Sequence, residues 1–159
     1  MKLNKLESRG RVSGVRVALL LSLLAALVMS VVLIPQTFAA TVTPSSYSTP
    51  GIQSAINSAN AGDTINLSGA LNGQVTLTGT LNIPKSINFD GGSSGVTILL
   101  GSGITSAHLT VTGNTSACVL GLTNVTLKGN SPSAQGGGIN TSASGGAVTI
   151  NASNSSIQN

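Results

Sequence analysis

From residue 63 onward, the chain consists of short stretches in which apolar and polar residues alternate. Val, Ile, Leu and Thr alternate over three to five residues in most of them, and each stretch ends near Gly, Asn or Ser. This pattern is typical of short β-strands with one buried face. The stretches follow one another about every ten residues, and they occupy residues 64–69, 74–79, 86–92, 96–101, 108–114, 118–121, 124–130, 136–139, 147–151 and 155–159.

Two all-β architectures fit this pattern: a sandwich or barrel built from hairpins, and a solenoid of stacked coils. Sandwich cores usually rely on aromatic side chains, whereas residues 40–159 contain only Tyr47 and Phe89. Hairpins favour two-residue turns of the Asn-Gly type, and the chain offers one candidate, Asn72-Gly73. Both observations favour the solenoid.

An internal echo at an offset of 30 residues supports the same conclusion. Residues 118–129 align with residues 148–159, so that apolar positions fall on apolar positions and Asn falls on Asn. In a parallel coil each residue stacks on its equivalent one turn away, at about 4.8 Å. The predicted stacking pairs are Cys118 with Val148, Leu120 with Ile150, Asn124 with Asn154, Thr126 with Ser156, and Leu127 with Ile157.

Residues 50–62 are predicted to form one short amphipathic helix. Thr49 is the expected N-cap, Pro50 suits the first helical position, and Gly62 suits the end. Apolar residues recur at i, i+3, i+4 and i+7, namely Ile52, Ala55, Ile56 and Ala59. Because the first coil of a solenoid exposes an apolar end, we expect this helix to cap it.

The first 39 residues have the form of a secretory signal peptide. A basic stretch precedes the uncharged apolar segment 17–34, and Thr37 and Ala39 provide small residues at positions −3 and −1. We therefore expect cleavage after Ala39, followed by a Ser/Thr/Pro-rich linker over residues 40–49. The alternative is an uncleaved anchor, since 18 apolar residues approach the ~20 that span a bilayer. Both alternatives place the remaining chain outside the cytoplasm.

Charge is concentrated in the leader and scarce elsewhere. The chain carries seven Lys and Arg residues against three Asp and Glu residues. Beyond residue 16 only Lys85, Lys128, Asp63 and Asp90 remain. A nucleic-acid interface requires clustered basic residues on the folded part, so nucleic-acid binding is excluded. A single cysteine excludes an internal disulfide framework and a CxxC metal or redox motif.

Two segments resemble a known group of proteins. Residues 52–69 (IQSAINSANAGDTINLSG) resemble the opening of bacterial extracellular β-helix proteins that carry a CSLREA-type N-terminal segment. Residues 122–159 resemble their repeated coils and those of polymorphic outer-membrane proteins. This sequence lacks the Cys and the acidic residue of the CSLREA segment. The resemblance implies a right-handed parallel β-helix of the pectin-lyase-like superfamily, covering about residues 52–159.

Enzymes of the pectin-lyase-like superfamily also have this fold, so catalysis has to be considered. Their chemistry resembles either a Ca²⁺ site of several carboxylates with an Arg base or paired Asp residues for glycoside hydrolysis. Residues 40–159 contain only Asp63 and Asp90 as acids, and no Arg. We therefore expect no catalytic, cofactor-binding or metal-binding site in this chain. Asp63 is interpreted as closing the helix or leading into the first strand, and Asp90 as a turn residue.

The remaining candidates also have structural interpretations. His108, the only histidine, is expected at the edge of a strand, and no G-x-S-x-G motif accompanies it. Cys118 is expected to be a small core residue. The glycines of residues 136–138 are expected to form a tight corner rather than a phosphate loop.

Two sets of polar residues have the spacing of regular arrays. Asparagines that end strands are expected to stack their amides in turns, and these are Asn114, Asn130 and Asn151. Thr76, Thr78 and Thr80 form a T-x-T-x-T row on one predicted strand. Such a row could belong to a flat ice-binding surface, but it does not recur at the spacing of the coils.

These observations together predict a secreted or cell-surface β-helix that serves as a structural stalk or an adhesin-like binding surface. Its partner would be an extracellular glycan or protein, and it would contact a membrane only through residues 17–34 if the leader stays uncleaved. The alternative is the N-terminal part of a polysaccharide-active enzyme whose catalytic coils lie beyond Asn159. Coils 63–159 are expected to be incomplete at their C-terminal end, so we also expect end-to-end self-association.

Overall fold

The computed structural model describes residues 39–113, 117–129, 138–143 and 146–158. Its contacts divide the chain into two units, of which the second, Ala39–Asn159, contains all of these residues. The predicted leader lies outside the described residues except for Ala39.

The described residues form short strands and one α-helix, in agreement with a mostly β architecture. The helix is α2 (Thr49–Ser58), and a single 3-10 turn covers Leu71–Gly73. The strands are β1 (Thr41–Val42), β2 (Thr64–Asn66), β3 (Gln74–Leu77), β4 (Leu81–Ile83), β5 (Ile87–Asp90), β6 (Val96–Leu100), β7 (Leu109–Gly113), β8 (Cys118–Thr123), β9 (Val125–Lys128), β10 (Ile139–Ala143), β11 (Val148–Ser153) and β12 (Ser156–Gln158).

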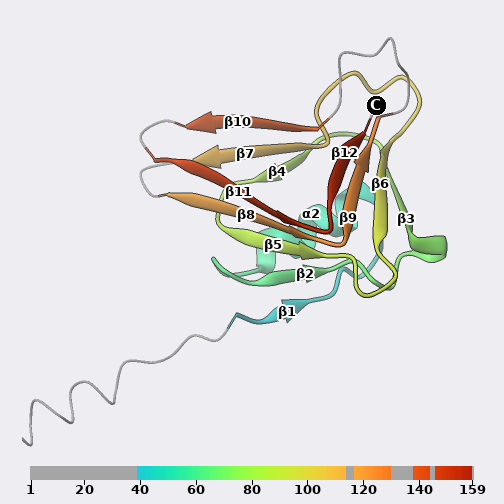
Figure 1. Cartoon of the computed structure of the whole chain (residues 1–159), viewed down its shortest axis with the longest axis horizontal. Helices are drawn as coiled ribbons and strands as arrows, with labels where there is room; N and C mark the ends of the chain where they lie inside the picture. The colour runs from blue at the N-terminus through green and yellow to red at the C-terminus, as the bar shows by residue number, and fades with distance from the viewer. Residues whose placement is uncertain (1–38, 114–116, 130–137, 144–145, 159) are drawn as a thin grey trace, which may run out of the picture. The chain divides into compact units, whose positions relative to one another are not determined.

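The strands build three sheets in which every pairing is parallel. Sheet A has the order β1-β2-β5-β8-β11, sheet B the order β12-β9-β6-β3, and sheet C the order β10-β7-β4. From β2 onward, consecutive strands enter sheets A, B and C in a fixed rotation, and each new pass adds one strand to each sheet (Figure 1). The hairpin alternative is therefore wrong for the described strands, because hairpins would pair consecutive strands antiparallel.

The register confirms the predicted 30-residue echo. Cys118 pairs with Val148 and Leu120 with Ile150 in sheet A. Thr126 pairs with Ser156 and Leu127 with Ile157 in sheet B. The step is shorter at the N-terminal end, where the pairs Thr41–Thr64 and Thr64–Asn88 are 23 and 24 residues apart. The early passes therefore have shorter connections than the later ones.

The interior is filled by the inward-facing residue of each alternating pair. Strands β5, β6 and β7 alternate buried and partly exposed residues along their length. Phe89 is the largest fully buried side chain, and the rest of the core consists mainly of Ile, Leu and Val. Since stacked aliphatic side chains fill the space, the core does not depend on aromatic residues.

Left-handed backbone turns mark the corners between sheets A and B. Asn72 and Gly73 have φ values of 56° and 63° and connect β2 to β3, which belong to different sheets. This pair was the one candidate hairpin turn, and it is a corner instead. Asn124 and Asn154 have φ values of 54° and 47° at the equivalent corners of later passes. Asn tolerates this conformation better than other residues with a side chain.

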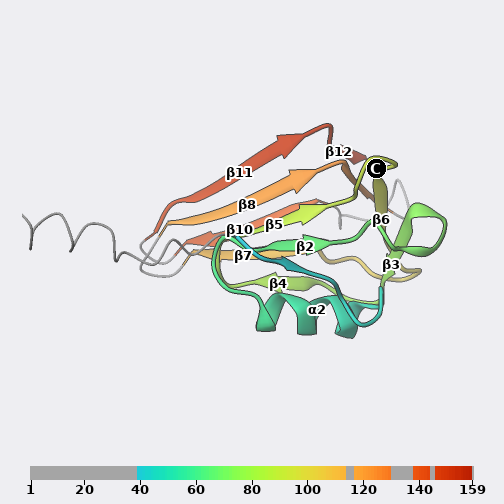
Figure 2. The ribbon, with the colours of Figure 1, turned by 90° about the horizontal axis from the view of Figure 1, so that it is seen from below.

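Helix α2 lies at the N-terminal end of the stack, opposite β11 (Figure 2). It begins one residue earlier than predicted, because Ser48 rather than Thr49 is the N-cap and its Oγ accepts a hydrogen bond from the Gly51 N–H. It also ends at Ser58, well before Gly62. Ile52 and Ile56 are fully buried against the core. The predicted amphipathic face is thus the face that packs.

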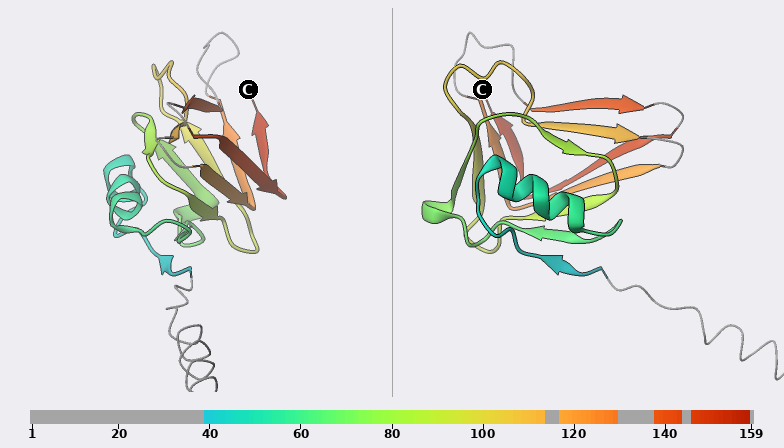
Figure 3. Two further views of the ribbon diagram at one scale, coloured as in Figure 1. Left: turned by 90° about the vertical axis from the view of Figure 1, so that its left-hand side faces the viewer. Right: turned by 180° about the vertical axis from the view of Figure 1, so that it is seen from behind.

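Polar groups of α2 bond the edge of the sheets beneath it. The Gln53 side chain accepts a hydrogen bond from the Asn82 N–H at 2.8 Å and donates one to the Asn82 carbonyl at 3.0 Å. The Thr49 hydroxyl accepts from the Thr78 N–H at 2.8 Å. The view from behind shows the helix across this end of the molecule (Figure 3, right). These bonds replace part of the strand that would otherwise pair with β4.

Two strands were not predicted. Residues 40–49 were expected to be a linker, but β1 within them pairs with β2. Strand β4 (LNI) was also missed, and it pairs with β7 at the edge of sheet C. Two or three residues are too few for the alternation of apolar and polar positions to be recognised.

Candidate functional site

A groove of about 560 Å³ runs along the corner between sheets A and B. It crosses four successive passes of the chain, because its lining comes from the turn before β3, the turn before β6, and the corners before β9 and β12. The lining residues are Asn72, Gly73, Ser93, Ser94, Gly95, Val96, Thr97, Asn124, Thr126 and Asn154. The groove is therefore lined by hydroxyl, amide and backbone groups, without an ionisable side chain.

The register explains why these hydroxyl groups lie in one row. Thr97 pairs with Thr126, and Thr126 pairs with Ser156, so three outward hydroxyl residues follow each other across sheet B. The Thr126 and Ser156 hydroxyl oxygens are 3.2 Å apart and share a hydrogen bond. The same 30-residue step places Asn154 beyond Asn124. A periodic surface of neutral donors and acceptors results.

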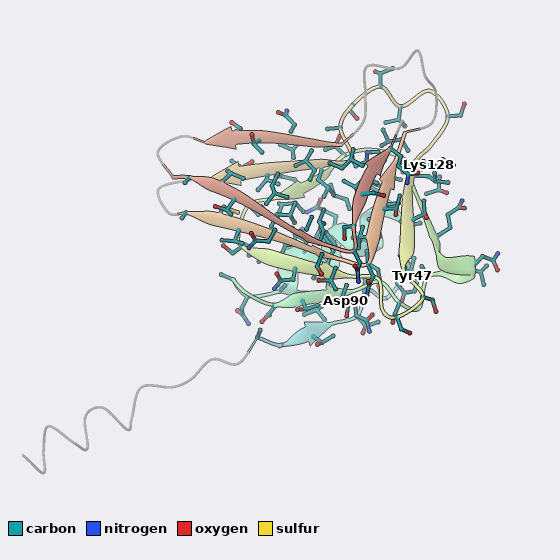
Figure 4. All side chains as sticks on the ribbon, viewed as in Figure 1. Tyr47, Asp90 and Lys128 are labelled. Carbon is teal, nitrogen blue, oxygen red and sulfur yellow. The ribbon has the colours of Figure 1, made fainter. Side chains whose placement is uncertain are left out.

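The charged residues lie away from this groove. Figure 4 shows Asp90 and Lys128 at separate places on the ribbon. Asp90 Oδ1 accepts a hydrogen bond from the Gly92 N–H at 2.8 Å, which is the turn interaction predicted for it. Lys128 is exposed at the end of β9. Neither side chain is among the groups that line the groove.

Asp63 lies at the opposite end of the stack, after α2. Its Oδ2 accepts from the Asn60 N–H at 2.7 Å, and its Oδ1 accepts from the Ala40 N–H at 2.8 Å. These two backbone donors, together with Lys85, hold the pKa of the carboxyl below its ordinary value of 3.8. Asp63 thus joins the end of the helix to the start of β1. Asp63 and Asp90 are on different elements and do not form a pair of the glycosidase kind.

His108 is fully buried between two passes of the chain. Its Nδ1 accepts a hydrogen bond from the Gly138 N–H at 3.0 Å, so its Nε2 carries the proton and donates to the Lys128 carbonyl at 3.0 Å. Burial lowers the pKa of this imidazole, and the Lys128 carbonyl partly opposes that shift. The position at the beginning of a strand agrees with the prediction, but the complete burial was not expected. Both ring nitrogens are engaged by the backbone.

Cys118 occupies the predicted core position opposite Val148. It is 3% exposed, and burial raises the pKa of its thiol. A raised pKa and an apolar setting oppose formation of the reactive thiolate. The thiol therefore packs as a small core side chain.

The predicted polar arrays are found only in part. Asn151 lies within β11 opposite Gly121, so the amide stack expected of it is wrong; Asn114 and Asn130 lie outside the described residues. Asn124 and Asn154 are the asparagines that repeat at a corner, as the sequence echo indicated. Gly136 and Gly137 are also outside the described residues.

The threonine row does not form one flat face. Strand β3 ends at Leu77, so only Thr76 belongs to it. The Thr78 hydroxyl donates to the Thr49 hydroxyl at 3.3 Å, and the Thr80 hydroxyl donates to the Ala107 carbonyl at 2.7 Å. These three side chains therefore serve different neighbours.

Among the described residues, no three His, Cys, Asp or Glu side chains gather as a metal site would require. No helix within the described ranges is both long and apolar enough to cross a membrane. The groove can offer hydrogen bonds to a ligand, and its described lining contains no group suited to general acid–base or nucleophilic chemistry. Comparison of the chain with protein-family models, curated proteins and solved structures finds no match.

Proposed function

We propose that this chain is a secreted or cell-surface right-handed parallel β-helix that serves as a structural stalk with an adhesin-like binding surface. The fixed rotation through three parallel sheets supports the helical winding. The right hand is the one that parallel crossover connections nearly always adopt. The resemblance of residues 52–69 and 122–159 to extracellular β-helix proteins supports the same assignment.

The observation that carries the binding function is the neutral groove that continues across successive passes. Its ligand would be an extended, uncharged and hydroxyl-rich polymer, because the lining offers hydroxyls and amides and lacks charge. A neutral glycan has this chemistry. The aromatic platforms that many sugar sites use are absent from the groove's described lining, so we expect weak binding per sugar unit and a dependence on polymer length.

Affinity electrophoresis tests this proposal with dextran as a neutral probe and carboxymethyl dextran as its charged counterpart. We expect the neutral polymer to retard the protein more strongly. Thr97→Ala should weaken retardation about two- to tenfold by removing a hydrogen-bonding group from the groove. Thr110→Ala is the matched control, because Thr110 is the outward threonine of the middle strand in sheet C. Equal retardation of both variants would contradict binding in the groove.

The alternative, an N-terminal part of a polysaccharide-active enzyme, would place catalysis in coils beyond Asn159. It makes a different prediction for the same chain. A neutral groove would then serve as an extension of a substrate site located elsewhere, and dextran binding would depend on the presence of those further coils.

A further inference from the structure

Ordered backbone pairing begins at Ala40. The Ala40 N–H donates a hydrogen bond to Asp63 Oδ1 at 2.8 Å, and the Ala40 carbonyl accepts one from the Thr64 N–H at 2.8 Å. Strand β1 begins at the next residue and pairs with β2. The backbone nitrogen of Ala40 is therefore fixed against a carboxylate.

That carboxylate is nearly buried and is held in its charged form. Asp63 is 4% exposed, and its second oxygen accepts from the Asn60 N–H. Lys85 contributes a favourable field, but its ammonium group donates to the Asn57 and Ala59 carbonyls at the end of α2. The Ala40 and Asn60 donors are both neutral backbone N–H groups. A cation at the position of the Ala40 nitrogen would compensate this buried charge more fully.

The sequence places a cleavable bond at this nitrogen. Thr37 and Ala39 predict hydrolysis of the Ala39–Ala40 peptide bond by a signal peptidase. The water oxygen joins the Ala39 carbonyl carbon, which becomes a carboxylate and leaves with the leader. The Ala40 nitrogen becomes an amine, which is mostly protonated at neutral pH because its ordinary pKa is about 7.7–8.0.

We propose that removal of the leader completes this site, because it creates an α-ammonium group at Ala40 that forms an ion pair with Asp63. The inference rests on the proposed export. A charged donor forms a shorter and stronger hydrogen bond to a carboxylate than a neutral amide does. The processed chain is therefore more stable than its precursor. Cleavage one residue later would remove Ala40 and leave Asp63 without this partner, so the structure favours the bond after Ala39.

The test uses the full chain, purified in detergent and treated with a purified signal peptidase. Mass spectrometry identifies the new N-terminus, and circular dichroism follows thermal unfolding before and after cleavage. We expect the melting temperature of the wild type to rise by about 3–5 °C. Asp63→Asn should show no comparable rise, because the amide cannot form the ion pair. Asp90→Asn is the matched control and should rise as the wild type does, since Asp90 bonds its own turn.

The pH dependence separates the ion pair from a general effect of losing the apolar leader. The partner carboxylate raises the pKa of the ammonium group, so the gain on cleavage should be present at pH 7 and lost as the pH rises through that raised pKa. This measurement needs only the wild type, so it holds even if Asp63→Asn does not fold. An equal gain in Asp63→Asn, a gain that persists at pH 11, or a new N-terminus other than Ala40 would overturn the inference.

The outcomes also distinguish this inference from the proposed function. Retention of the leader by exported cells would contradict export, whereas the cleavage in detergent would still report on the ion pair. Dextran retardation depends on the groove at the A–B corner and should be the same for Asp63→Asn and the wild type.

Discussion

The side-chain amide of Gln53 pairs with both backbone polar groups of Asn82, so that a helix residue occupies the place of a neighbouring strand. Unpaired strand edges readily recruit other strands. The helix α2 thus covers the N-terminal end of the stack with apolar contacts from Ile52 and Ile56 and with this strand-like pair of hydrogen bonds.

Replacement of Gln53 should destabilise the N-terminal end. We expect Gln53→Ala to lower the free energy of unfolding by about 1–2 kcal/mol, because two hydrogen bonds are lost. Gln53→Glu keeps an acceptor for the Asn82 N–H but sets a carboxylate against the Asn82 carbonyl, so it should not restore the wild-type value. Urea denaturation measures both. Wild-type stability of Gln53→Ala would show that the pair contributes nothing.

Gly91 and Gly79 should respond oppositely to alanine. A Cβ on Gly91 would lie 2.1 Å from the Asn124 carbonyl oxygen, which is part of the adjacent backbone. We expect Gly91→Ala to cost about 3 kcal/mol or more through the displacement of that corner. A Cβ on Gly79 would meet nothing within 4 Å, so Gly79→Ala should be neutral or slightly stabilising. Similar urea midpoints for the two variants would contradict the close approach of these passes.

Cys118 should react slowly with thiol reagents until the protein unfolds, because it is buried and its thiol pKa is raised. Cys118→Ser should lower the free energy of unfolding by about 1–3 kcal/mol, since it places a poorly satisfied hydroxyl in the core. Cys118→Val is the control, because Val148 fills the equivalent position of the next pass. Rapid labelling of the native protein would contradict the burial of this thiol.

His108 should make stability fall as the solution becomes acidic. Its pKa in the fold lies below the ordinary value of 6.5, so the unfolded chain binds a proton more readily. The contribution of the neutral imidazole is therefore complete above pH 6.5 and is lost as the pH falls through the lowered pKa. A second ring proton would face the Gly138 N–H donor.

Urea midpoints measured from pH 8 to pH 4.5 test this, with His108→Gln as the control that cannot titrate. Asp63 does not interfere, because its pKa is lowered from 3.8 and its contribution is lost only at more acidic pH. A flat profile for the wild type over this range would show that His108 is not held neutral in the fold.

The C-terminal end of the described stack should promote self-association. Strands β10, β11 and β12 are edge strands of their sheets, and Ile150 and Ile157 are 42% and 57% exposed at inward-facing positions. Because α2 covers the other end, we expect two copies to join through their C-terminal ends rather than form a head-to-tail polymer.

Ile157→Lys should weaken this association, since it places charge on the contact surface. Leu71→Lys is the matched control, because Leu71 is 81% exposed at a corner remote from the strand edges. Sedimentation across a concentration series compares them. A wild type that stays monomeric, or an equal effect of both substitutions, would contradict the prediction.

The sequence alone determined the parts that depend on short-range periodicity. Alternation between buried and outward positions located most strands, and the spacing of Ile52, Ala55 and Ile56 located the helix. The echo at 30 residues predicted which residues pair in the last two passes, because equal numbers of residues per pass stack equivalent positions on each other.

The tertiary structure decided what depends on connections of unequal length. The groove brings Gly73, Gly95, Asn124 and Asn154 to one corner, although the steps between successive passes range from 23 to 33 residues. No fixed period relates these residues, so their meeting follows from how each connection folds between paired strands. The burial of His108 has the same origin, since its two partners lie 20 and 30 residues away on later passes.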